Sequence, residues 1–251
     1  MDSITQAALG ATVAGAIAGR KCNAKVLLVG AALGTLPDLD VILDYGDAVQ
    51  NTIKHRGFSH SLLVLLPFSW IISWLYCHWK PDNFWNLSRT FSLTACVLVT
   101  HALLDAMTTY GTQLIWPIQG YFSLNSVFII DPLYTVPLLV AIGVSLFSRS
   151  RGSRWCLSML LTSTLYLGWG YASQQIVASR VEDNLVSQNL PRQQVLITPT
   201  PFNTLLWRVI VMDEGQYWEG LASILDGHSR IDFVSRPLGQ WPLQDNPETL
   251  K

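Results

Sequence analysis

The chain has 251 residues, of which 50% are hydrophobic and only 13% are charged, and its formal net charge is −1. Soluble domains carry about 25% charged residues, so the composition indicates a membrane protein whose first partner is the lipid bilayer. The small net charge gives no support for a nucleic-acid partner. The amino-terminal sequence MDSITQAALG lacks the basic region of a secretory signal, so we expect a retained helix there.

Six apolar segments are expected to form membrane-spanning helices, because about 20 apolar residues cross a bilayer. They are Ile4–Gly19, Val26–Leu43, Ser61–Trp79, Phe91–Tyr110, Pro132–Phe147 and Trp155–Ala172. Several are short for a span, and a soluble helical bundle is the alternative for the weakest of them. The first two are rich in glycine and alanine, and small residues let helices approach closely in lipid.

The sequence becomes more polar and richer in proline after residue 178. Four stretches enriched in β-branched and aromatic residues predict strands: Gln194–Thr198, Leu205–Met212, Gln216–Leu225 and Arg230–Ser235. We therefore expect a mainly α fold, a polytopic transmembrane helical bundle with a small C-terminal β-rich region. Residues 1–178 form the transmembrane metal-site domain, and residues 179–251 form a small antiparallel sheet. At about 70 residues the sheet has little core, so we expect it to pack over the mouth of the bundle.

Basic residues between the helices set the expected orientation, since lysine and arginine are retained in cytoplasmic loops. Eight of them fall in the first, third and fifth loops, whereas the second loop has only Lys54 and Arg56. The odd-numbered loops are therefore expected in the cytoplasm. This makes the chain a multi-pass protein of the cytoplasmic membrane with an extracytoplasmic C-terminal region.

Histidine and aspartate side chains collect at the outer ends of the second and fourth helices and in the loop between the second and third. They are Asp38, Asp40, His55, His60, His101 and Asp105. Carboxylate oxygen and neutral imidazole nitrogen are the ligands of hydrolytic metal sites. His101 and Asp105 are spaced i,i+4 and share one helix face; the alternative for this pair is a buried hydrogen bond without metal. Asp38 and Asp40 follow a proline, and in an extended or turn geometry both carboxylates can point the same way; the alternative for this pair is two solvated loop carboxylates at a helix end.

Six such groups exceed what one catalytic zinc ion needs, which is three protein ligands and a water. The sequence leaves open one or two divalent ions, most simply zinc, with spare carboxylates beside them. Either arrangement would activate water, and Asp40 or Asp105 is the expected general base.

Other polar residues near these ligands have expected roles. Arg56 is expected to bind an anionic oxygen of the substrate, because its planar guanidinium suits phosphate; the alternative is an ion pair with Asp44 or Asp47. Ser59 is expected to cap the helix that begins near His60. Four further residues could line the site or serve only as turn and interface residues: Tyr110, Thr112, Asn125 and Asp131.

These motifs resemble the YdjM-like family of integral-membrane metal-dependent hydrolases. The resemblance rests on MDSITQAALGA, GTLPDLDV, HRGFSHSLL and THALLDAMTTYGTQLIWP, and it continues through NSVFIIDPLYTVPLL and NTLLWRVIV. It implies that the six histidines and aspartates named above build the site. A likeness of the family to zinc-dependent phospholipase C implies a lipid or phosphoester substrate. Many members have a histidine where this chain has Gln6, so a metal ligand from the first helix is in doubt.

Two other functions fit the same residues. A metal or ion transporter would need a polar path to the inner face, and beyond Thr94 and Thr100 the helices have few polar residues. A non-enzymatic membrane protein would use the cluster as a structural metal site, with four ligands and no open position. The oligomeric state has no signature in the sequence.

Overall fold

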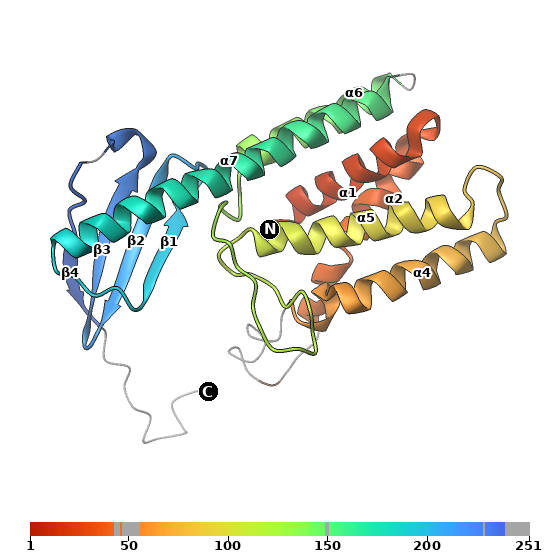
Figure 1. Cartoon of the computed structure of the whole chain (residues 1–251). Helices are drawn as coiled ribbons and strands as arrows, with labels where there is room; N and C mark the ends of the chain where they lie inside the picture. Colours follow the sequence, from red (N-terminus) through yellow and green to blue (C-terminus); the bar gives the residue numbers. More distant parts are fainter. Residues whose placement is uncertain (43–45, 47–55, 149–150, 228, 239–251) are drawn as a thin grey trace.

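The computed structural model of the chain describes residues 1–42, 46, 56–148, 151–227 and 229–238. Lys54, His55 and Arg149 lie outside these residues, as do Asp44 and Asp47. Among the described residues, six α-helices precede a four-stranded antiparallel sheet (Figure 1). The helices are α1 (Ser3–Ala18), α2 (Ala24–Thr35), α4 (Leu62–Trp79), α5 (Leu87–Ala106), α6 (Pro132–Phe147) and α7 (Gly152–Ser187). The described part of the chain also has four short 3₁₀ helices: η1 (Gly19–Lys21), η2 (Pro37–Ile42), η3 (Phe58–His60) and η4 (Ile224–Asp226).

Most of the helices begin where the sequence offers a side-chain cap. Asp2, Asn23, Asn86 and Asp131 accept hydrogen bonds from backbone N–H groups in the first turns of α1, α2, α5 and α6. Such caps satisfy donors that the first turn of a helix leaves free. The six helices correspond to the six apolar segments. The second ends at Thr35 rather than at the predicted Leu43, since a proline disfavours helix in the residue before it and here begins η2 at position 37.

The helices expose large apolar side chains and bury small polar ones. On α4, Ser69 and Ser73 are fully buried, whereas Trp70, Ile71 and Trp74 are about half exposed. This inside-out pattern suits a helix whose solvent is lipid rather than water. By length and composition, α4 and α5 are the two described helices that could each cross a membrane. Crossing by all six helices stays a prediction.

Glycines bring α1 and α2 into backbone contact. A Cβ atom at Gly30 would lie 2.4 Å from the carbonyl oxygen of Gly10, and one at Gly34 would lie 2.5 Å from that of Gln6. With no side chain between them, the two backbones approach as closely as small residues allow. Because α5 packs against both helices, α1, α2 and α5 form the centre of the bundle.

The sheet has the order β1-β2-β3-β4, with β1 (Val195–Pro199), β2 (Leu206–Asp213), β3 (Gln216–Ser223) and β4 (Val234–Pro237), and all neighbours are antiparallel. Alternate residues of a strand share one face, and on β2 these are Trp207, Val209 and Val211, all fully buried. They form one core with residues spaced four apart on α7, namely Val177, Val181 and Leu185.

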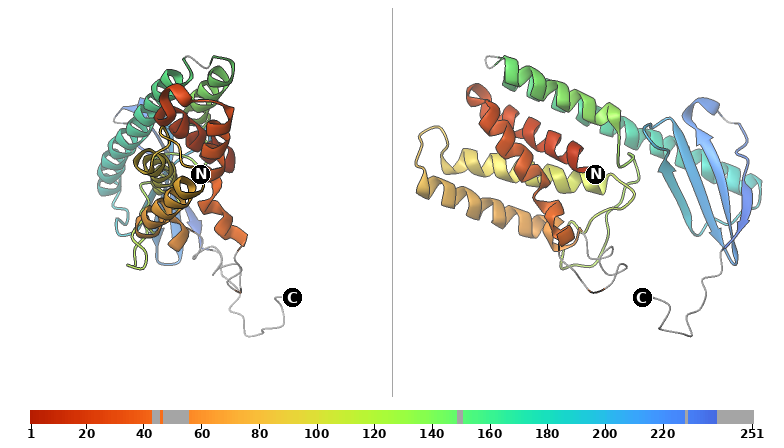
Figure 2. Two further views of the ribbon diagram at one scale, coloured as in Figure 1. Left: turned by 90° about the vertical axis from the view of Figure 1, so that its right-hand side faces the viewer. Right: turned by 180° about the vertical axis from the view of Figure 1, so that it is seen from behind.

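The sheet packs on α7 rather than over the mouth of the bundle. Figure 1 and the right view of Figure 2 show it beyond one end of the helices, beside the C-terminal half of α7. At 36 residues, α7 is about 54 Å long, far longer than a hydrocarbon core of about 30 Å. It runs through the predicted boundary after residue 178 and supplies the apolar surface that the sheet lacks. The expected covering of the mouth is therefore wrong.

Replacing Gly34 with alanine is expected to destabilise the protein by about 1–3 kcal/mol, the usual cost of overpacking. The new Cβ would meet a backbone oxygen of α1, which has little room to move aside. Gly143→Ala is the control, because nothing lies within 4 Å of a Cβ there, and alanine favours the helix by up to about 1 kcal/mol. Thermal unfolding of the purified proteins in detergent measures both, and equal Tm values would contradict this account of the contact.

Candidate metal centre

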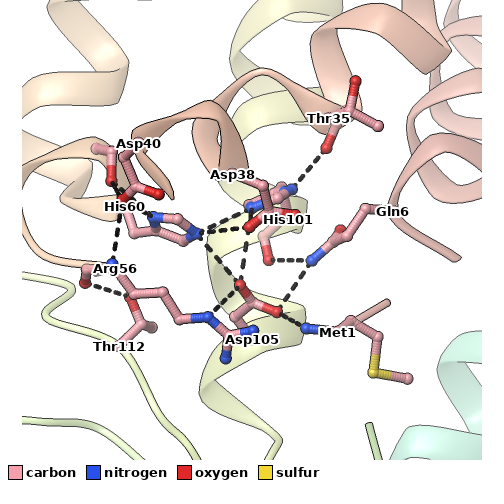
Figure 3. A network of polar contacts seen from close by, with 12 residues as sticks. Met1, Gln6, Thr35, Asp38, Asp40, Arg56, His60, His101, Asp105 and Thr112 are labelled. Atoms are coloured by element: carbon pink, nitrogen blue, oxygen red, sulfur yellow. Dashed lines mark hydrogen bonds and ion pairs between the residues drawn. The ribbon is translucent and has the colours of Figure 1, made fainter. Parts of the chain in front are cut away.

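Four of the six predicted ligands converge on one point (Figure 3). They come from three elements: Asp38 from η2, His60 from η3, and His101 and Asp105 from α5. His60 Nε2 lies 3.0 Å from His101 Nε2, 3.2 Å from Asp105 Oδ2 and 3.5 Å from Asp38 Oδ1. His101 Nε2 lies 3.5 Å from Asp38 Oδ1 and 3.7 Å from Asp105 Oδ2.

These separations are those that one small cation imposes on its ligands. Tetrahedral bonds of about 2.0 Å place ligand atoms about 3.3 Å apart, and octahedral bonds of about 2.1 Å place adjacent ones about 3.0 Å apart. The four atoms therefore fit a single divalent ion without selecting zinc over other metals.

Both imidazoles are turned so that Nε2 is the bare nitrogen. His101 Nδ1 lies 2.6 Å from the carbonyl oxygen of Gly34, which only accepts, so the proton is on Nδ1. His60 Nδ1 lies 2.9 Å from Ser59 Oγ, whose own hydroxyl donates to Asp40, so this Nδ1 is also the donor. Two nitrogen lone pairs and two carboxylate oxygens then face one another, and this arrangement requires a cation or an added proton between them.

The protonation of the metal-free cluster reflects the same requirement. Burial lowers the pKa of His60, but hydrogen bonds to Asp105 and Asp38 outweigh burial and raise that pKa above its usual value. Burial raises the pKa of Asp38, but hydrogen bonds from His101 and His60 hold it well below its usual range. Positive charge at the cluster is therefore favoured, whether a proton or a metal ion supplies it.

Asp40 lies behind His60, away from the point of convergence. Its Oδ2 accepts hydrogen bonds from the backbone N–H of Arg56 and the hydroxyl of Ser59, and it is 3.9 Å from His60 Nδ1. A 3₁₀ helix has three residues per turn, so side chains two apart point in directions about 120° from each other. The expectation that Asp38 and Asp40 point the same way is therefore wrong, as is the capping role expected of Ser59: α4 begins at Leu62.

Arg56 reaches the cluster from the other side. Its Nε lies 3.4 Å from Asp105 Oδ2, and its side chain is 11% exposed. Among the described residues, Nε and Nη1 are buried without a hydrogen-bond acceptor. The backbone of Arg56 is held firmly, because its carbonyl oxygen accepts from Gln113 N and Thr112 Oγ1. Tyr110 adds a ring 5.7 Å from the guanidinium carbon.

Gln6 positions Asp105, a role that the sequence did not reveal. Its Nε2 donates to Asp105 Oδ1 at 3.1 Å and approaches the carbonyl oxygen of His101 at 3.4 Å. The amino group of Met1 also contacts Asp105 Oδ1, so that Oδ2 is the oxygen turned toward the histidines. A glutamine within an apolar segment is the sequence signal that could have indicated this role, since polar groups that become buried need partners.

The remaining candidates lie outside the cluster. Asp131 is fully buried, but it caps α6 and accepts a hydrogen bond from Tyr166 at 2.8 Å. Asn125 has a positive φ of 50° and accepts from the hydroxyl of Ser123, which indicates a turn residue. His55 lies outside the described residues. Metal binding by the four converging residues stays a prediction.

We expect the purified protein to contain one divalent metal ion per chain when no chelator is used, and His101→Ala to remove it, because one of four ligands is lost. Asp40→Asn should weaken metal affinity by about 10- to 100-fold, the usual effect of disturbing a group that orients a ligand. His78→Ala is the control, since this histidine is exposed and stacks on Trp74 in α4, 5.5 Å between ring centroids. Elemental analysis and metal titration measure all three; metal-free wild-type protein would contradict the site.

Comparison with known proteins places these residues in a family. A family model described as "YdjM inner membrane protein" matches residues 1–177. The chain is 27% identical over 214 residues to the uncharacterized protein YfhP of Bacillus subtilis, covering 82% of this chain and 63% of that protein. It is 30% identical over 114 residues to the inner membrane protein YbcI of Escherichia coli, covering 45% of this chain and 64% of that protein.

The chain thus spans less than two thirds of the length of either relative. No solved structure matches it significantly. The family model covers all of the residues that converge at the candidate metal centre and well over half of the chain. The chain therefore belongs to the YdjM family of inner membrane proteins.

Proposed function

We propose that the chain is a membrane-embedded, metal-dependent hydrolase that acts on a phosphoester at the outer face of the cytoplasmic membrane. The observation that carries the proposal is the buried guanidinium of Arg56 beside the four converging ligands. Leaving a buried charged donor without an acceptor costs more than about 1–3 kcal/mol, so an anionic ligand is the natural partner for Nη1. A guanidinium beside a cation is the arrangement that stabilises charge on a phosphoryl group.

We assign the roles of the four converging residues from the exposure of their side chains. His60 and Asp105 have fully buried side chains and His101 is 1% exposed, so these three are assigned to hold the cation. Asp38 is the most exposed of the four at 18%, and we assign it to take the proton from the attacking water. A divalent ion held there would acidify water and polarise a phosphoryl oxygen.

The two carboxylates first expected to act as base have other partners. Asp40 accepts from Ser59 and from the backbone of Arg56, and it serves to orient His60. Asp105 is held through Oδ1 by Gln6, which leaves Oδ2 for the cation. The general base therefore falls to Asp38.

A structural metal site is the second candidate, and the number of ligands favours it. Four protein ligands at tetrahedral separations close a zinc site, whereas catalytic zinc keeps one position open. Transport has less support, because among the described residues all buried acidic, basic and histidine side chains lie at one end of the bundle. Farther in, the buried contact between α4 and α5 has hydroxyl groups such as those of Ser73 and Thr94, which carry no charge to bind an ion in transit.

Hydrolysis of a soluble phosphodiester and of phospholipid vesicles by the metal-loaded protein tests the proposal. Arg56→Gln is expected to lower kcat/KM by about 10- to 100-fold, because a charge-assisted hydrogen bond of about 1.5–3 kcal/mol is lost, and to retain the metal. Arg89→Gln is the control, since Arg89 lies at the far end of α5 over the ring of Phe84. If the protein binds one metal ion per chain but hydrolyses neither substrate, the hydrolase is rejected and the structural metal site is the remaining candidate.

The outer-face location follows from the charges at the two ends of the bundle. The described basic residues of the first, third and fifth loops lie at the end opposite the cluster, as the course of the helices in Figure 1 shows. By the positive-inside rule, this distribution of charge supports an outer location for the cluster and the sheet.

Cysteine labelling tests this orientation. In a background without the four native cysteines, Glu214→Cys, in the exposed β2–β3 turn, is expected to react with a membrane-impermeant maleimide in intact spheroplasts. Lys80→Cys, exposed after α4, should react only after permeabilisation. The reverse pattern would reject the outer location and leave the metal chemistry untouched.

A further inference from the structure

The α5–α6 loop, residues 107–130, is an uncharged loop at the same end of the bundle as the candidate metal centre (Figure 1). It has no lysine, arginine, aspartate, glutamate or histidine, although soluble domains carry about 25% charged residues. An exposed apolar patch of the kind that this loop forms marks a surface that contacts a partner or a membrane. The large apolar side chains that are at least 39% exposed there include Tyr110, Ile115, Trp116, Ile118, Phe122 and Leu124.

Hydrogen bonds fix the depth of this loop relative to α4. The backbone N–H of Leu62, the first residue of α4, donates to the carbonyl oxygen of Leu114 at 2.9 Å, and the hydroxyl of Ser61 donates to that of Trp116 at 3.0 Å. By length and composition α4 could cross a membrane. At 1.5 Å per residue it is about 27 Å long, close to a hydrocarbon core of about 30 Å. The loop is therefore tied to the end of that span, where the hydrocarbon of a bilayer would give way to headgroups.

The patch on the loop continues the apolar surface of α4. Phe58, in η3, meets Trp116 edge to face with ring centroids 6.4 Å apart, and it lines one cavity of about 300 Å³ together with Val64 and Phe68 of α4. Tryptophan and tyrosine gather at membrane interfaces, because their rings are apolar and their N–H or O–H groups are polar. A bilayer therefore suits this patch better than a water-soluble partner, since the same surface runs on along a helix that is turned toward lipid.

The same loop holds Arg56. The N–H of Gln113 and the hydroxyl of Thr112 donate to the carbonyl oxygen of Arg56 at 3.1 and 3.2 Å, and the Tyr110 ring lies 5.7 Å from the guanidinium carbon. The backbone of Arg56 has a φ of 62°, a left-handed conformation that a residue with a side chain keeps only where its surroundings impose it. A displacement of the loop is therefore expected to free this backbone and to move the guanidinium away from Asp105.

We propose that the α5–α6 loop lies in the boundary between headgroups and hydrocarbon of the adjacent leaflet, and that this contact with the bilayer keeps Arg56 at the candidate metal centre. Tyr110, Trp116 and Ile118 are the side chains assigned to the bilayer. The membrane then positions a residue of the site through this loop. The inference goes beyond the proposed function, because it requires no reaction at the site.

Collision measurements on a spin label test the depth of the loop. In a background without the four native cysteines, Ile118→Cys carries a nitroxide, and the protein is reconstituted in vesicles of phosphatidylethanolamine and phosphatidylglycerol. Oxygen concentrates in hydrocarbon, whereas a nickel chelate added to both sides stays in water. The ratio of oxygen to nickel collisions is expected to be several-fold higher at this position than with Leu225→Cys, a control that is 76% exposed on the sheet.

Two results would overturn the proposal. Equal collision ratios at the two positions would place the loop in water. Spin–spin broadening at position 118 with few collisions by either reagent would show that a second copy of the chain, rather than lipid, covers the loop.

An acidic substitution tests the link between the loop and Arg56. Ile118→Asp puts a charge into the apolar patch and is expected to drive the loop into water, so that phenylglyoxal modifies Arg56 several-fold faster than in wild-type protein in the same vesicles. Leu225→Asp is the matched control and should leave the rate unchanged. Ile118→Ser, a milder change, repeats the comparison if Ile118→Asp fails to fold. Equal rates in the loop variants, the control and the wild type would reject the link. Neither measurement uses a substrate, so hydrolysis without these effects keeps the proposed function and rejects this inference.

Discussion

Four electron-rich atoms that converge inside an apolar bundle need a positive charge among them, and much of this structure serves to hold that arrangement. Two imidazole nitrogens and two carboxylate oxygens converge there, and each imidazole nitrogen lies 3.0 to 3.7 Å from the other three atoms. Isolated buried charge costs far more than folding can supply. Arg56 and the amino group of Met1 already bring positive charge to Asp105, and the four converging residues could hold a metal ion as a further positive charge.

Three of the four converging side chains are oriented by a hydrogen-bond partner, and two of these partners lie on another helix. The carbonyl oxygen of Gly34 on α2 turns His101, the hydroxyl of Ser59 turns His60, and Gln6 on α1 turns Asp105. Gly34 and Gln6 lie on α2 and α1, the two helices that glycines bring into backbone contact. The contact between α1 and α2 therefore also positions the groups that orient His101 and Asp105.

The same end of the bundle combines an apolar exterior with a charged interior. All the described buried acidic, basic and histidine side chains lie there, whereas the helix surface toward lipid has tryptophan, leucine and isoleucine. The sheet stands beyond that end on α7, whose length exceeds a bilayer core. Membership of a family of inner membrane proteins agrees with this distribution of polar and apolar groups.

The sequence by itself determined the local elements. Apolar runs located six helices, β-branched and aromatic stretches located four strands, and the i,i+4 spacing of His101 and Asp105 placed both on one helix face, because these features depend on neighbours along the chain. It could not decide what depends on contacts between distant segments. The 3₁₀ geometry of residues 37–42 turns Asp38 toward the cluster and Asp40 toward the back of His60, because side chains two apart point in different directions in that geometry. Likewise, only tertiary packing showed that Gln6 holds Asp105 and that the sheet rests on α7, because burial of a polar group or an apolar face is satisfied by whichever partner the fold brings near.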